Sequence, residues 1–307
     1  MNNIFNDLQA MYDYYLYMKD YWYEGDEIDV NLQNSLNDDS ELFRFVVDYY
    51  GYNKFPCVIP TREFNKLTVP ELYHGFKDYD YGANFLTDYT YHYGGGYNDG
   101  FYLTKSRKFA GLYTKNNYVN DGQVLKVKLL SDNGGKLSDI SSYFDAFYNE
   151  IKDIYDKKNI GLEEIYVDPE ILKEGYSDED FFYKLKEAIK QNKPASHEYN
   201  ISKVEDENIR KKLYALKYFY LNKLNSGENK KVLDYFIEDF IYNPSTTSVF
   251  LGYDYMIDDI GDSNHVILFN RSAICVPEAE AKRFLTKSKN YKEAIPSKFK
   301  NIDEIQR

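Results

Sequence analysis

Apolar residues recur every three or four positions at the start of the chain and again through its middle, and this spacing predicts helices. The first stretch covers residues 4–24, and the second runs from Ser40 to Tyr50 with Gly51 as its stop signal. Between Ser141 and about Tyr242, further stretches have the same spacing: SYFDAFYNEIKDIYDKK, SDEDFFYKLKEAIKQN, DENIRKKLYALKYFYLNKL and KKVLDYFIEDFIYN.

Short runs of alternating polarity, or of apolar residues between turn signals, predict strands on both sides of this helical middle. The expected strands and their neighbours are a short strand with His74, a strand over residues 100–104 that enters a helix with Tyr113, strands over 123–130, 136–140, 248–251 and 265–269, and a last helix over 278–284.

These elements predict an α+β protein in which a sheet-based core is interrupted by helices. We expect an N-terminal helical segment (1–65), a first half of the core (66–140), a helical insertion (141–243), a second half of the core (244–285) and a polar tail (286–307). The insertion is suited to target choice, inhibition or oligomer contacts, or it is a helical layer that completes the core.

The composition narrows the classes of function. The chain has 307 residues, 43% hydrophobic and 18% aromatic, which is enough apolar surface for a sizeable core. Its formal charge of −12 disfavours nucleic-acid substrates, because binding to phosphates depends on lysine and arginine. Two cysteines are too few for a disulfide framework, and no apolar run is long enough to span a membrane. We expect a cytoplasmic protein, in the producing cell or in a target cell.

Candidate chemistry gathers between residues 71 and 114. Gly75 would let a ligand approach the backbone closely, and Tyr102 and Tyr113 offer flat apolar faces with polar tips, so a planar amide such as nicotinamide would fit between the rings. The alternative is that these two are ordinary core or surface aromatics, since the chain has 34 tyrosines.

Three motifs in order carry a resemblance to a known family. They are LYHG at 72–75, GFYLT at 100–104 with FAGLY at 109–113, and GYDYMI at 252–257 with NHVILFNRSAI at 264–274. Together they resemble ADP-ribosyltransferases of the His-Tyr-Glu type, and the last resembles phage-associated and toxin-like members. The resemblance covers roughly residues 66–130 and 246–277, and it implies an ADP-ribosyltransferase-like split sheet.

The resemblance also implies NAD as the ligand and gives each site residue a role. His74 would bond the adenosine ribose, Gly75 would bond the nicotinamide carboxamide, and Tyr102 with Tyr113 would stack on the nicotinamide ring. At the position of the family's glutamate this chain has His265.

A neutral imidazole at that position can accept a proton but carries no fixed negative charge. We therefore expect His265 and Asp262 as catalytic residues, with Asp258 as the alternative carboxylate. The alternative is that His265 is a strand residue with a satisfied hydrogen bond. With no paired spacing among the four histidines, no metal site is expected.

The expected function is NAD-dependent mono-ADP-ribosylation of a macromolecule, more readily a protein than a nucleic acid, by a toxin-like or phage-encoded effector. An inhibitory partner is compatible with this class. The alternative is a non-catalytic binding protein or phage structural protein on a degenerate ADP-ribosyltransferase scaffold, for which the missing glutamate is the main argument.

Overall fold

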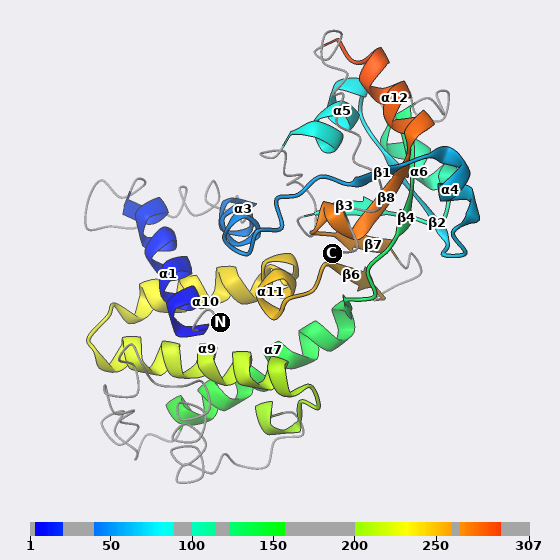
Figure 1. Ribbon diagram of the computed structural model, residues 1–307. Helices are drawn as coiled ribbons and strands as arrows, with labels where there is room; N and C mark the ends of the chain where they lie inside the picture. The colour runs from blue at the N-terminus through cyan, green and yellow to red at the C-terminus, as the bar shows by residue number, and fades with distance from the viewer. Residues whose placement is uncertain are drawn as a thin grey trace. The chain divides into compact units, whose positions relative to one another are not determined.

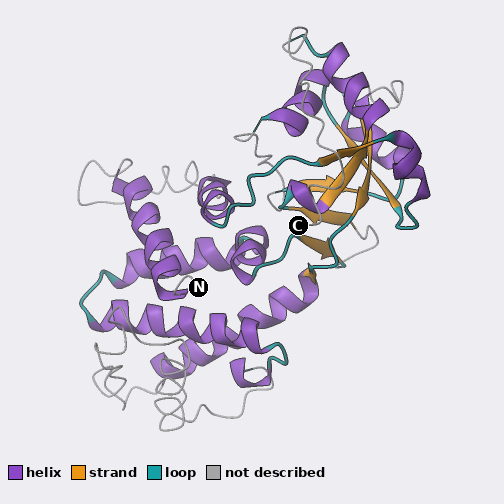
Figure 2. Cartoon of the chain, viewed as in Figure 1, coloured by secondary structure: helices purple, strands orange, loops and turns teal. Residues whose placement is uncertain are grey.

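A computed structural model describes residues 4–20, 40–88, 100–114, 123–156, 200–259 and 265–289. They form helices and strands, which confirms the α+β class (Figure 1). The chain divides into two compact units, Met1–Phe45 with Asp139–Thr247 and Val46–Ser138 with Ser248–Arg307. All described strands belong to the second unit (Figure 2).

The first unit is built from helices around an aromatic core. The ring of Tyr12 packs edge-on against Phe219 and Phe236, at centroid distances of 5.8 and 5.1 Å. A buried ion pair joins Glu150 to Lys217, with 2.7 Å between Oε2 and Nζ. Its helices are α1 (Ile4–Asp20), most of α7 (Leu137–Asp156), α9 (Glu207–Asn225), α10 (Lys230–Tyr242) and the short η5 (Ile201–Lys203).

Three helices continue across a boundary between the units, namely α3 (Ser40–Tyr49), α7 and α11 (Pro244–Leu251). The prediction for α3 is confirmed, and Gly51 beyond it has a positive φ of 69°, which glycine adopts without strain. The end of the first predicted helix, residues 21–24, and the segment SDEDFFYKLKEAIKQN lie outside the described residues.

The second unit contains two four-stranded sheets, with strand orders β1-β8-β4-β2 and β3-β7-β6-β5. The first has strands β1 (Cys57–Ile59), β2 (Glu71–Gly75), β4 (Val124–Leu129) and β8 (Ile274–Pro277). The second has β3 (Phe101–Leu103), β5 (Gly134–Lys136), β6 (Tyr255–Asp258) and β7 (His265–Leu268). The helical segments of this unit are α4 (Thr61–Lys66), α5 (Tyr79–Thr87), α6 (Arg107–Ala110), η1 (Gly111–Tyr113), η6 (Arg271–Ala273) and α12 (Glu278–Lys287).

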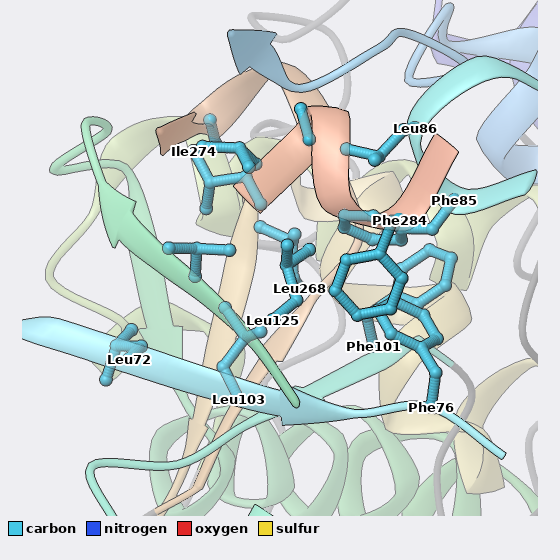
Figure 3. Packing of buried hydrophobic residues seen from close by; sticks show 14 of the residues in the cluster. Leu72, Phe76, Phe85, Leu86, Phe101, Leu103, Leu125, Leu268, Ile274 and Phe284 are labelled. Carbon is cyan, nitrogen blue, oxygen red and sulfur yellow. The ribbon is translucent and has the colours of Figure 1, made fainter. Parts of the chain in front are cut away.

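One apolar cluster joins the strands to α5 and α12 (Figure 3). The ring of Phe85 lies 4.6 Å from Phe101, and that of Phe76 lies 5.5 Å from Phe284. Gly82 allows α5 and α12 to approach, because a Cβ there would lie 2.2 Å from Cδ1 of Phe284. Burying one such ring contributes roughly 1.5 to 3 kcal/mol.

The GYD and NRSA motifs hold each other. The carboxylate of Asp254 accepts hydrogen bonds from the Ser131 hydroxyl at 2.6 Å and the Asn270 amide at 2.7 Å. Buried Arg271 donates to the carbonyl oxygens of Phe85 and Asp88, both at 2.7 Å, and so caps the last turn of α5. These motif residues therefore stabilise the fold.

The predicted strand at 248–251 is wrong, because these residues belong to α11. The Asn243 side chain accepts from the N–H groups of Ser245 and Thr246, both at 3.1 Å, and Pro244 takes the first helical position. A short apolar run cannot by itself distinguish a buried strand from a helix.

The predicted strand at 136–140 is also wrong. Strand β5 ends at Lys136, and α7 begins at Leu137. The Asp259 carboxylate accepts from Ser138, from its N–H at 2.9 Å and from its hydroxyl at 2.6 Å, and thus caps the helix. Because Asp259 is distant in sequence, no local pattern announces this start. Helices α4 and α5 were not predicted from the sequence.

Candidate functional site

The two sheets meet at their edge strands, β2 and β3. One isolated antiparallel bridge joins them in the described part of the chain. In it, the N–H of Tyr73 donates to the Thr104 carbonyl at 2.8 Å, and the N–H of Thr104 donates back at 2.9 Å. Strand β2 otherwise pairs with β4, and β3 with β7. Past the bridge, towards Gly75, no further ladder pair joins the two strands among the described residues, and we call this unpaired stretch the gap between β2 and β3.

Gly75 is the next residue of β2 whose backbone points into this gap. In an antiparallel strand, hydrogen-bonding direction alternates from one residue to the next. Tyr73 bonds towards β3, and Phe76 donates the other way, to Gln123 O at 3.0 Å. The N–H and C=O of Gly75 therefore point towards β3, and neither has a hydrogen-bond partner among the described residues. Gly75 is buried, so this donor and acceptor lack the bonds that buried groups normally have.

His74 faces the opposite way, into the core. Its side chain is 6% exposed, and its ring lies beside Phe76 and Phe101 at 4.4 and 6.1 Å. Nδ1 lies 2.7 Å from the Tyr102 carbonyl oxygen, which can only accept, so Nδ1 carries the proton. Burial lowers the pKa of His74 to about 4, and the bond to Tyr102 opposes this shift. A neutral imidazole thus ties β2 to β3 where their ladder ends.

Segment α6–η1 covers the other face of β2. A Cβ on Gly75 would lie 1.9 Å from the Ala110 carbonyl oxygen and 3.4 Å from Cβ of Tyr113. Glycine is therefore required here by close packing, and the same packing brings the Cβ of Tyr113 beside Gly75. The Tyr113 side chain is 61% exposed. The Cβ of Tyr113 thus lies beside Gly75, while most of its side chain is accessible from outside.

His265 lies in an aromatic group with Tyr102, Phe109 and Tyr113. The Phe109 ring lies 5.0 Å from the His265 ring at 32°, and 5.7 Å from Tyr113 in an edge arrangement. Tyr102 lies edge-on to His265 at 6.2 Å. We name these four residues the aromatic group. It connects both predicted tyrosines to His265.

The imidazole of His265 is half-buried, and its Nδ1 is fully buried without a hydrogen-bond partner among the described residues. This differs from the alternative of a satisfied strand histidine. Burial lowers the pKa of His265, and the carboxylate of Asp258 opposes that shift. Asp258 is its direct cross-strand neighbour.

The structure thus brings together Gly75, Tyr102, Tyr113 and His265, and places His74 behind them in the core. Asp262 lies outside the described residues. Phe109 was not singled out from the sequence, although its spacing of four from Tyr113 is a signal that two rings share one helical face.

Known proteins give no further guide. No protein-family model, curated protein or solved structure matches this chain. The resemblance of the three motifs therefore stays a prediction, and membership of a family is not shown.

Two absences hold for the described residues only. They contain no group of three histidine, cysteine or acidic side chains placed to bind a metal ion. None of their helices has the length and apolar content that crossing a bilayer requires.

Chemically, the site combines a two-point amide contact with flat apolar walls. A primary carboxamide can donate to the Gly75 carbonyl and accept from its N–H at the same time. Tyr102, Phe109 and Tyr113 offer ring faces and edges for an aromatic ligand. His265 adds one neutral group able to accept a proton.

Proposed function

We propose that this protein transfers single ADP-ribose units from NAD to a macromolecular acceptor, on an ADP-ribosyltransferase-like split sheet. The observation that carries the proposal is the unpartnered N–H and C=O pair of Gly75, directed into the gap between β2 and β3. A nicotinamide carboxamide is complementary to that pair. Independent support comes from the aromatic group beside it, which suits the nicotinamide ring.

In the proposed reaction, the bond between the nicotinamide nitrogen and the ribose C1′ breaks, and its electron pair leaves with nicotinamide. A nucleophile of the acceptor forms the new bond to C1′ and gives up its proton. His265 takes that proton as general base, a role typically worth 10²- to 10⁴-fold in rate. Asp262 is proposed as a carboxylate that acts with His265 in the site.

In the proposed site His74 is a positioning residue. Its bond to the Tyr102 carbonyl sets the distance between the strand with Gly75 and the strand with the stacking tyrosine. The role that the resemblance implies for it, a bond to the adenosine ribose, belongs to the same proposal.

The acceptor is proposed to be a protein. A net charge of −12 opposes close approach to a phosphate backbone, and the helical unit offers a separate surface for target choice or for an inhibitory partner. Such a protein would act in a cytoplasm as a toxin-like or phage-encoded effector.

A second candidate function is binding without catalysis. Phe109 lies against His265, and Ala110 packs against Gly75, so the protein's own groups already contact both walls of the site. With no glutamate at position 265, the scaffold would then serve recognition alone.

Nicotinamide release separates the two candidates. Purified protein is incubated with NAD, with and without cell lysate as a source of acceptors, and free nicotinamide is measured by chromatography. Thermal unfolding with NAD reports binding, because a ligand that binds only the folded state raises the melting temperature. We expect release and stabilisation in the native protein.

The variants are Tyr102→Ala and Tyr113→Ala, and Tyr81→Ala on α5, 39% exposed, is the control. The first two should lose release, while the control keeps it. NAD stabilisation without release would favour binding alone. If the native protein shows neither nicotinamide release nor stabilisation by NAD, NAD is not its ligand.

A further inference from the structure

Strand register places three side chains of the second sheet on one face. Cross-strand partners share a face, and residues two apart along a strand share it too. Tyr102 is opposite Ile267, and His265 is opposite Asp258. Because His265 and Ile267 are two apart, Tyr102, His265 and Asp258 share this face. The apolar cluster of Figure 3 uses the other face, through Phe101 and Leu268 among others.

On this face the His265 ring has a nitrogen atom that lacks a hydrogen bond. Its Nδ1 is buried and has no hydrogen-bond partner among the described residues, and leaving a buried polar atom unbonded is unfavourable. The Phe109 ring covers the imidazole, and Tyr102 borders it. The ring is therefore confined by aromatic neighbours, while its Nδ1 makes no hydrogen bond within the described residues.

Two adjacent carboxylates lie at the end of β6, Asp258 as its last residue and Asp259 directly after it, and Asp259 already has hydrogen-bond partners. Asp259 accepts both the N–H and the hydroxyl of Ser138 at the start of α7. Asp258 is the direct cross-strand partner of His265 and acts on it electrostatically. Of the two, Asp258 is the one placed to serve the imidazole.

We propose that Asp258 is the positioning carboxylate of His265: in the substrate-bound site it accepts a hydrogen bond from Nδ1–H, which leaves Nε2 as the proton acceptor. The pair supplies, from two neighbouring strands, the negative charge that a single glutamate would supply. This inference rests on the proposed function, since the pair acts on the same reaction. Asp258 need not touch the substrate.

The matched pair of variants is Asp258→Asn and Asp259→Asn, which remove the same charge from adjacent positions. Asp258→Glu keeps the charge and tests rescue. The first measurement is the pKa of His265 by NMR of histidine-labelled protein, with His265→Gln to assign its signal among the four histidines. The second is the pH profile of nicotinamide release.

We expect Asp258→Asn to lower the pKa of His265 by about one unit. It should also reduce release at least tenfold, with partial recovery in Asp258→Glu. Asp259→Asn should leave the His265 pKa in place, whatever it does to thermal stability. An unchanged His265 pKa in folded Asp258→Asn protein would overturn the pairing.

The two measurements keep the failures apart. The NMR titration needs no turnover, so it tests the pair even in an inactive protein. If Asp258→Asn lowers the pKa of His265 but the native protein releases no nicotinamide, the proposed function is overturned and the pairing stands. Release that is equal in the native and Asp258→Asn proteins would overturn the role of Asp258.

Discussion

The two described histidines of the sheet unit have the same chemistry in different surroundings. His74 is enclosed by phenylalanine rings and donates to a backbone carbonyl, whereas His265 is half-buried with an unbonded Nδ1. Burial lowers the pKa of both. The comparison teaches that hydrogen-bond satisfaction, more than the direction of the pKa shift, distinguishes an imidazole that holds the fold from one available for chemistry.

The largest expected effect is on the stability of the His74 region. His74→Ala removes a packed ring and leaves the Tyr102 carbonyl without its donor, so we expect a loss of about 3 to 4 kcal/mol in the free energy of unfolding. Urea denaturation measures it. His265→Ala is the control, with an expected change below about 1 kcal/mol; equal losses would abolish the distinction between the two histidines.

Acid should destabilise the fold through protonation of His74. Its folded pKa of about 4 lies below the ordinary value of 6.5, so folding favours the neutral ring. The resulting stability is fully present above pH 6.5 and is lost as pH falls from there through 4, by at most about 3 kcal/mol. Urea denaturation between pH 7 and 4 should show this slope, and His74→Gln should flatten it. The same slope in both proteins would assign the acid sensitivity to other groups.

The expected effect of His265→Gln is on catalysis. Glutamine keeps a polar side chain of similar size but accepts no proton near neutral pH, so nicotinamide release should fall about 100-fold. The melting temperature should stay within a few degrees of the native value. A variant that keeps full activity would show that the base is another group.

The smallest expected effect is that of Phe109→Leu. Leucine keeps apolar volume but loses the ring that covers His265, so the imidazole should become more exposed and its pKa should rise towards 6.5. Release should fall by about tenfold at most. A matched change on the opposite face, Phe101→Leu, should reduce stability and leave the pKa of His265 in place.

Much of the secondary structure of the second unit can be predicted from local sequence patterns. The short strands at His74, Tyr102 and His265 are confirmed, as is the helix that leads to Tyr113. Their alternation is fixed by the need to bury one face, which is visible in the sequence. That same alternation places His74 and Gly75 on opposite faces of β2.

What the sequence could not predict depends on contacts between distant residues. The start of α7 needs Asp259, and the end of α5 needs Arg271. The Phe109 contact with His265 likewise joins residues far apart in sequence. The unpartnered Gly75 backbone is defined only once the pairing of both edge strands is known.

The central claim is that the Gly75 backbone binds a carboxamide. Selective ¹⁵N labelling of the 17 glycines, with nicotinamide and NAD as titrants, follows the Gly75 amide directly. Nicotinic acid is the matched ligand control, because its carboxylate cannot donate to the Gly75 carbonyl. We predict a saturable shift of the Gly75 signal with nicotinamide and NAD, and none with nicotinic acid. A Gly75 signal that stays unchanged at saturating NAD would contradict the account.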